Sequence, residues 1–162
     1  MATSVAAPGD RLRRLWARLA PLPGGKRLFG WMLGRMVPYT GTIRPRVLEL
    51  RPGYAKIQMA DRRRVRNHLN SVHAVALANL GEVTSGLAML TGLPSGLRGI
   101  PVGLSLTYLK KARGPVTAEA RCALPDSTTE VEQDFQAVIS DASGDIVARA
   151  TVRWRIGPVP SR

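Results

Sequence analysis

A long apolar run over residues 71–91 dominates the hydrophobic pattern of the chain. It consists mostly of Ala, Leu and Val, which are good or fair helix formers, and it contains neither Lys nor Arg. Polar residues that can cap a helix, Asn67, Asn70 and Ser71, stand at its start. Because Glu82 interrupts the run, we expect the buried helix of a soluble domain rather than a membrane span.

The segments on both sides of this helix alternate between apolar and polar residues with a period of two, which is typical of half-buried strands. Before the helix, two strands are predicted over residues 42–50 and 53–60, joined at the turn sequence Arg51-Pro52-Gly53. After the helix, residues 92–101 are predicted to form a loop. Four further antiparallel strands are expected around residues 104–108, 116–122, 135–139 and 146–156.

The predicted order of elements is therefore strand, strand, long helix and four strands. A sheet with one apolar face must cover something, and the 71–91 helix is the element that is long and apolar enough. We therefore predict an α+β fold in which a curled antiparallel sheet of about six strands surrounds a central helix.

Basic and apolar residues mix over residues 10–36, before this pattern begins. The apolar side chains of its first part follow helical spacing: Leu12, Leu15, Trp16 and Leu19. We predict a basic amphipathic helix that ends at the Pro/Gly-rich residues 21–25, followed by a second helix over residues 26–36. Such helices could touch an anionic membrane surface, or they could lie against the domain and cover an open face.

Length and composition limit the number of domains and the kind of partner. A chain of 162 residues fits one domain, here residues 37–162, preceded by a basic helical appendage over residues 1–36. The formal net charge of +13 calls for an anionic partner, unless the arginines only form a solvated surface. Aromatic residues make up 5%, and no nucleic-acid recognition motif is present, so we expect no nucleic-acid partner.

The chain contains a single cysteine, Cys122, which bears on the compartment of the protein. It cannot form an internal disulfide, and it fits a reducing, cytoplasmic compartment, with membrane association through residues 10–36 left open. Its place in an alternating strand predicts a buried, inert thiol. No Cys/His group has the spacing of a metal site, so no metal is expected.

Two segments of the chain carry a family resemblance. The spacing Asn67-x5-His73-x8-Glu82 and the segment from Tyr108 to Gly114 resemble the hotdog-fold acyl-CoA thioesterases of the phenylacetyl-CoA thioesterase type. In that group an Asn precedes a His-Gly-Gly at the helix start, and an Asp or Glu lies nine residues after the His. The amino-acid sequence from Asn67 to Glu82 is more similar still to an uncharacterised hotdog branch known as a domain of unknown function. The resemblance covers about residues 37–157.

The chain departs from the family's pattern at three places. The two glycines after the His are Ala74 and Val75, and the proline of the family's Pro-Ala-x-x-Gly turn is Lys111. The position of an assisting Ser or Thr in some members is Pro101, so that assistant is missing. Replacing Gly by Ala keeps the backbone N–H donor, so catalysis stays open.

Helix geometry separates the matched residues within one chain. Asn67 and Glu82 are fifteen positions apart, which is about 22 Å along a helix axis. His73 and Glu82 are nine apart and lie on opposite faces at about 100° per residue. A shared site therefore requires two chains related by a two-fold axis, as the resemblance implies for hotdog dimers. We expect a homodimer, or a tetramer that contains it.

In such a site the helix start of one subunit would face Glu82 of the other. The N–H of Ala74 could hold the thioester oxygen as it becomes an oxyanion, and Glu82 would act as general base on water or as nucleophile. Asn67 would orient the water or the carbonyl, and His73 would fix the loop by a side-chain hydrogen bond. The alternative for Glu82 is a carboxylate satisfied inside an interface.

The negatively charged part of an acyl-CoA or acyl carrier protein substrate would need basic residues. Lys110, Lys111 and Arg113, together with Gly114, are expected to bind the phosphates of coenzyme A. The arginines just before the helix are a second candidate group: Arg62, Arg63, Arg64 and Arg66. For both groups a solvated surface is the equal alternative.

Two other functions are compatible with the sequence. Hydroxyacyl-thioester dehydratases on this fold pair a His with a Glu fourteen residues later, and His68 and Glu82 have that spacing, although the Pro-Gly between them is here Ala76-Leu77. The other function is a non-catalytic protein that binds acyl-CoA or lipid.

Overall fold

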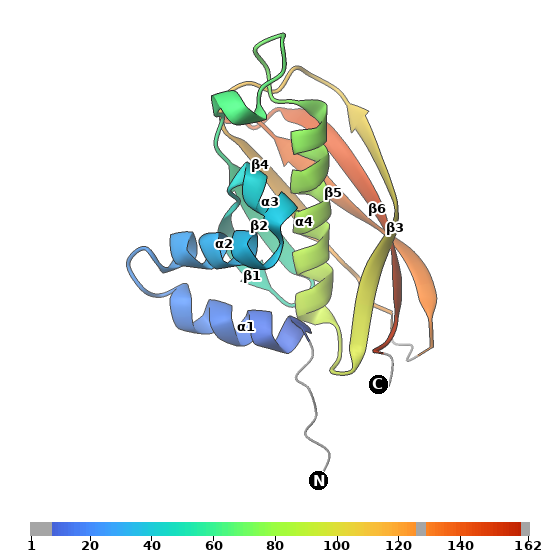
Figure 1. Cartoon of the computed structure of the whole chain (residues 1–162). Coiled ribbons are helices and arrows are strands. Elements are labelled where there is room, and N and C mark those ends of the chain that lie inside the picture. Colours follow the sequence, from blue (N-terminus) through green and yellow to red (C-terminus); the bar gives the residue numbers. More distant parts are fainter. Residues whose placement is uncertain (1–7, 126–128, 160–162) are drawn as a thin grey trace.

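The computed structural model describes residues 8–125 and 129–159. A six-stranded antiparallel sheet in the order β1-β2-β4-β5-β6-β3 curls around the long helix α4 (Ala74–Gly92) (Figure 1). The strands are β1 (Arg46–Arg51), β2 (Tyr54–Met59), β3 (Leu97–Tyr108), β4 (Val116–Arg121), β5 (Val131–Ser140) and β6 (Ile146–Pro158). The predicted fold class and the arrangement of the sheet around a central helix are confirmed.

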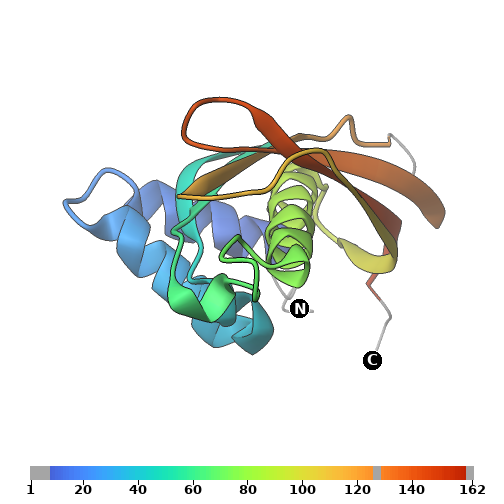
Figure 2. The ribbon, with the colours of Figure 1, turned by 90° about the horizontal axis from the view of Figure 1, so that it is seen from above.

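Helix α4 is the centre of the hydrophobic core. Seen nearly down its axis, it lies under the curled sheet (Figure 2). Gly81 lets the helix approach the sheet closely, since a Cβ there would lie 2.4 Å from the Cβ of Ala150 on β6. Within the described residues, α4 is the one helix long and apolar enough to cross a membrane, and 67% of that stretch is buried inside the domain. This burial is what the core helix of a globular domain requires.

The central helix begins later than residue 71, where the sequence pattern places its start. The N–H of Val72 donates to the carbonyl of Ala112 over 2.8 Å, so this residue is bonded to a neighbouring segment and not to a preceding turn of helix. His73 is the N-cap, with extended backbone dihedrals, and α4 starts at Ala74. Ser71 and Asn70 are therefore not helix caps.

The two predicted N-terminal helices are present as α1 (Pro8–Leu19) and α2 (Gly25–Met36). Their inward side chains Leu12, Phe29 and Leu33 belong to the same hydrophobic core as α4 and the sheet. Both helices thus cover a side of α4 that the sheet leaves open (Figures 1 and 2). Contact of residues 10–36 with a membrane stays a prediction.

The start of the first strand, predicted from the alternating pattern, is wrong. Thr42 and Ile43 belong to a short helix, α3 (Pro38–Ile43), and the first strand starts only at Arg46. Proline at the first helical position favours a helix start, which the alternating pattern does not register. A 3₁₀ helix, η1 (Arg63–Val65), precedes the loop that leads to α4.

Strand β3 is longer and more exposed than predicted. It starts at Leu97, inside the predicted 92–101 loop, and it accommodates Pro101 beside a register shift between Pro101 and Gly103. It lies at the edge of the sheet and, within residues 8–125 and 129–159, pairs only with β6. Most of its side chains are exposed, so the half-buried pattern expected for Leu104 and Tyr108 is wrong. Proline in a strand is typical of such an edge position.

Candidate functional site

The carboxylate of Glu82 lies near the middle of α4 and is about half-buried. It makes no ion pair or hydrogen bond with any residue in the described part of the chain. It lines a cavity of about 1000 Å³ on one side and a groove of about 380 Å³ on the other. Burial raises the pKa of this carboxyl above its ordinary value. A half-buried carboxylate without a partner is costly, so its presence between two cavities marks a candidate site.

Asn79 stands one helical turn before Glu82 and lines the same 380 Å³ groove. Its Nδ2 donates to the carbonyl oxygen of Tyr39 over 3.1 Å, which ties α3 to α4. Its Oδ1 is buried and has no hydrogen-bond partner among the described residues. An unpaired buried oxygen calls for an explanation, and a ligand or a water in the groove would supply the missing donor.

The start of α4 presents an unused backbone donor. The Nδ1 of His73 accepts a hydrogen bond from the N–H of Val75 over 3.1 Å, and the N–H of His73 donates to the carbonyl of Val65 over 2.7 Å. The side chain of His73 therefore caps the start of α4, and its backbone N–H ties the preceding loop to Val65. The N–H of Ala74 donates to no acceptor in the parts of the chain that the structure describes. It points along the positive end of the helix dipole.

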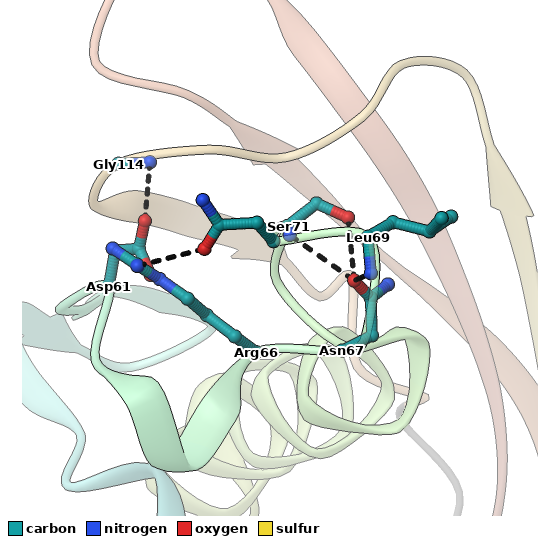
Figure 3. A network of polar contacts seen from close by, with 7 residues as sticks. Asp61, Arg66, Asn67, Leu69, Ser71 and Gly114 are labelled. Atoms are coloured by element: carbon teal, nitrogen blue, oxygen red, sulfur yellow. Dashed lines mark hydrogen bonds and ion pairs between the residues drawn. The ribbon is translucent and has the colours of Figure 1, made fainter.

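Asn67 organises the loop before the helix (Figure 3). Its Oδ1 accepts hydrogen bonds from the N–H of Leu69, the N–H of Ser71 and the hydroxyl of Ser71, at 3.0, 3.2 and 3.1 Å. All of its carbonyl capacity is used inside the loop, so Asn67 holds the backbone that leads into α4. A role in orienting water would have to come from its Nδ2.

A second polar network ties this loop to the segment after β3 (Figure 3). Arg66 donates to Asp61 over 2.6 Å and to Asn70 over 3.0 Å, and the other oxygen of Asp61 accepts from the N–H of Gly114 over 2.9 Å. The hydrogen bond from Arg66 holds the pKa of Asp61 below its usual range. Gly114 has φ +71°, a conformation that favours glycine, and its N–H is used here rather than free for a phosphate.

The residues expected to bind coenzyme A differ in whether they already form ion pairs within the protein. Lys110 is held by ion pairs to Asp141 and Asp145. Lys111 and Arg113 are exposed and make no ion pair within the described residues. Two basic side chains thus remain available near the helix start.

The structure gathers most of the predicted site residues at one end of α4. The hydroxyl of Tyr108 lies 3.4 Å from the carbonyl oxygen of Ala74, so the segment that follows β3 sits beside the helix start. Glu82 lies eight residues further along α4 than Ala74, which is about 12 Å along the axis. Within one chain, Glu82 and the helix start are therefore separate. His68 is exposed on the loop before the helix and is not on α4 with Glu82.

Sequence reasoning missed Asn79 and the contribution of the N-terminal helices to the large cavity. The signal for Asn79 was present, because it is an amide in an otherwise apolar run, three residues before Glu82. The cavity left no such signal, because it depends on how α1 and α2 pack on α4. Among the described residues, no group of His, Cys, Asp and Glu could hold a metal ion.

Comparison with known proteins places the chain in a family. The family model described as "Domain of unknown function (DUF4442)" matches residues 25–156. No curated protein sequence matches the chain significantly.

Solved structures share the fold. The structure described as genomics APC5556 is 31% identical, with TM-score 0.78, over 93% of this chain and 99% of that one. PA5026 from Pseudomonas aeruginosa, described as a protein of unknown function and probable thioesterase, is 24% identical, with TM-score 0.69, over 85% of this chain and 97% of that one. A mutant of the thioesterase SAV0944 from Staphylococcus aureus is 16% identical, with TM-score 0.67, over 75% and 99%. The chain therefore belongs to the family of the domain of unknown function DUF4442, and its fold is the hotdog fold that it shares with thioesterases.

Proposed function

We propose that the protein is a thioesterase that hydrolyses an acyl thioester of coenzyme A or of an acyl carrier protein, at a site shared by two subunits. The observation that carries this proposal is Glu82, a half-buried carboxylate without a partner among the described residues, placed between a groove and a large apolar cavity. The similarity of the fold to thioesterases supports the same reaction class.

The edge strand β3 supports a dimer. Its outer edge is unpaired in the described chain, and exposed apolar residues surround the neighbouring groove: Tyr39, Val75, Val102 and Leu104. Exposed edges of this kind favour pairing with another strand. Two β3 strands that pair antiparallel around a two-fold axis run in opposite directions. The Tyr108 end of one copy, next to Ala74, would then face the Pro101–Leu104 stretch of the other, which lines the groove of Glu82.

The mechanism follows from these positions. The Glu82 carboxylate removes a proton from a water molecule, and the water oxygen attacks the thioester carbonyl carbon. The carbonyl oxygen becomes an oxyanion that the N–H of Ala74 from the other subunit stabilises. The C–S bond then breaks, and the leaving sulfur takes the proton from Glu82. The Oδ1 of Asn79 is buried one helical turn before Glu82 and has no partner among the described residues, so a water held between the two side chains would donate a hydrogen bond to it.

A panel of acyl-CoA substrates, followed by release of free thiol, tests the proposal. Glu82→Gln removes the base at nearly constant size, and we expect kcat/KM to fall by about 10²–10⁴-fold. Glu49→Gln is the matched control, because Glu49 is an exposed residue of β1. The activity of this variant should be unchanged. If Glu82→Gln retains full activity on every hydrolysed substrate, Glu82 is not the catalytic base.

A further inference from the structure

The cavity of about 1000 Å³ beside Glu82 lies between α1, α2 and the C-terminal half of α4. Its walls are mostly apolar and include Leu15 from α1, Met32 from α2, and Gly86 and Leu90 from α4. A volume near 1000 Å³ is at the upper end of the range for small-molecule sites. An apolar space of this size is expected to take an apolar ligand.

The cavity runs along one face of α4. Glu82, Gly86 and Leu90 line it at intervals of four residues, so they lie on one face of α4. From Glu82 to Leu90 the helix axis runs about 12 Å. A carboxylate stands at one end of this stretch, and the rest offers aliphatic and aromatic side chains, among them Trp154.

The N-terminal helices are fixed components of this cavity. A Cβ on Gly9 would lie 1.9 Å from the carbonyl oxygen of Leu90, so α1 rests backbone to backbone on the end of α4. Trp16 of α1 packs edge-on against Phe29 of α2, with ring centroids 5.1 Å apart. The roof over the cavity is therefore held by its own packing, without any ligand.

The open side of the cavity is basic. Four arginines contribute to its lining and keep exposed side chains: Arg11, Arg14, Arg18 and Arg98. None of them makes an ion pair within the described residues. The first three follow helical spacing on one face of α1. Long basic side chains cover apolar surface with their stems and keep the charge in water, so the stems of these arginines extend the apolar wall while their charges stay at its surface.

We propose that this cavity binds the aliphatic chain of the acyl substrate, and that α1 and α2 determine which chain lengths the protein accepts. The proposal rests on the proposed function only in treating the bound aliphatic chain as part of a substrate. Binding of a long-chain carboxylic acid to the same cavity needs no hydrolysis and can be measured separately.

Trp154 reports occupation of the cavity directly, because it lines the cavity, whereas Trp31 is exposed and does not line it. The probe is a brominated octadecanoic acid, since bromine quenches tryptophan fluorescence on contact. The double variant Trp16→Phe, Trp31→Phe leaves Trp154, and the matched control Trp16→Phe, Trp154→Phe leaves Trp31. We expect saturable quenching of Trp154 and little quenching of Trp31. Binding of the acid without quenching of Trp154 would overturn the proposal.

A size change in the wall tests the role of α2. Met32→Trp fills part of the cavity, whereas Leu28→Trp lies on the same helix, is exposed and does not line it. We expect Met32→Trp to weaken binding of octadecanoic acid by about tenfold or more and to leave octanoic acid less affected, with Leu28→Trp unchanged. Circular dichroism checks that each variant is folded. Equal effects of both substitutions would contradict the proposal, and the Trp154 measurement stands even if Met32→Trp does not fold.

The two proposals fail in different ways. Quenching of Trp154 with no hydrolysis of any thioester of coenzyme A or of acyl carrier protein supports the cavity and contradicts the thioesterase function. Hydrolysis of long acyl-CoA substrates that Met32→Trp leaves unchanged, together with an unquenched Trp154, contradicts the cavity and supports the thioesterase function.

Discussion

The side-chain amide of Asn79 donates a hydrogen bond to the carbonyl oxygen of Tyr39 over 3.1 Å and leaves its own oxygen buried without a partner in the described part of the chain. An unsatisfied buried polar atom destabilises the fold by about 1–3 kcal/mol. A purely structural residue at this position would gain nothing from that oxygen. We therefore expect Asn79→Leu to change the free energy of unfolding by less than about 1 kcal/mol, in either direction, while hydrolysis falls by about tenfold or more.

Chemical denaturation and kcat/KM on the best acyl-CoA test this expectation together. Thr84→Val is a useful comparison, since the Thr84 hydroxyl donates to the carbonyl of Leu80 inside α4 and is fully buried. That variant should keep its kcat/KM. A loss of stability in Asn79→Leu without any loss of activity would make Asn79 a structural residue.

Glu82→Gln should stabilise the protein at neutral pH while it removes activity. Burial raises the pKa of Glu82 in the folded state above its value in the unfolded chain. Stability is therefore lost as the pH rises from the unfolded pKa to the folded pKa, and the penalty persists above both. We expect a higher Tm for Glu82→Gln than for the wild type at neutral pH, and equal Tm values at a pH below the unfolded pKa. A lower Tm at neutral pH would show that the carboxylate has a stabilising partner.

The loop before α4 should weaken in acid because of Asp61. The hydrogen bond from Arg66 lowers the folded-state pKa of Asp61, so its stabilisation is complete above the unfolded pKa and is lost as the pH falls through the folded pKa. We expect Asp61→Asn to lower the free energy of unfolding by about 1 kcal/mol at neutral pH, with a difference from wild type that disappears in acid. Thermal unfolding of both proteins over a range of pH measures this difference in stability. A difference that does not depend on pH would contradict the assignment.

Docking of α1 depends on the absence of a side chain at Gly9. Because a Cβ there would lie 1.9 Å from the carbonyl oxygen of Leu90, Gly9→Val must push α1 away from α4. We expect a loss of about 1–3 kcal/mol in the free energy of unfolding, together with loss of octadecanoic acid binding. Ala17→Val on the exposed face of the same helix is the control for helix propensity and should cost about 0.5 kcal/mol. Equal losses in the two variants would mean that α1 is not packed in this way.

The periodic pattern was a reliable guide where burial is regular. The apolar run around Glu82 predicted the central helix, and the alternation in β4, β5 and β6 predicted the strands, because each of these elements buries a continuous face. The pattern failed for β3, whose edge position exposes apolar residues, and for Thr42, where a proline four residues earlier starts a helix.

The candidate site was predictable in part. Glu82 was identified from the cost of a charge in an apolar helix. His73 was expected to fix the loop by a side-chain hydrogen bond, and in the structure its side chain caps α4 by accepting from the N–H of Val75. The hydrogen bonds that occupy Asn67 could not be predicted, since they depend on the path of the loop. The cavity under α1 and α2 could not be predicted either, because its walls come from three helices that meet only in the folded chain.

A mixed-dimer experiment tests whether Glu82 of one subunit works with the helix start of another. Glu82→Gln removes the base. Ala74→Pro removes the N–H donor at the first helical position, where proline is tolerated and the preceding His73 is already extended. Each variant alone should be inactive.

After unfolding and refolding of an equal mixture, half of the dimers contain one copy of each variant, and each of these has one intact site. If each site is built from two subunits, the mixture recovers about a quarter of the wild-type activity. A mixture that stays as inactive as its two components would contradict a site built from two subunits.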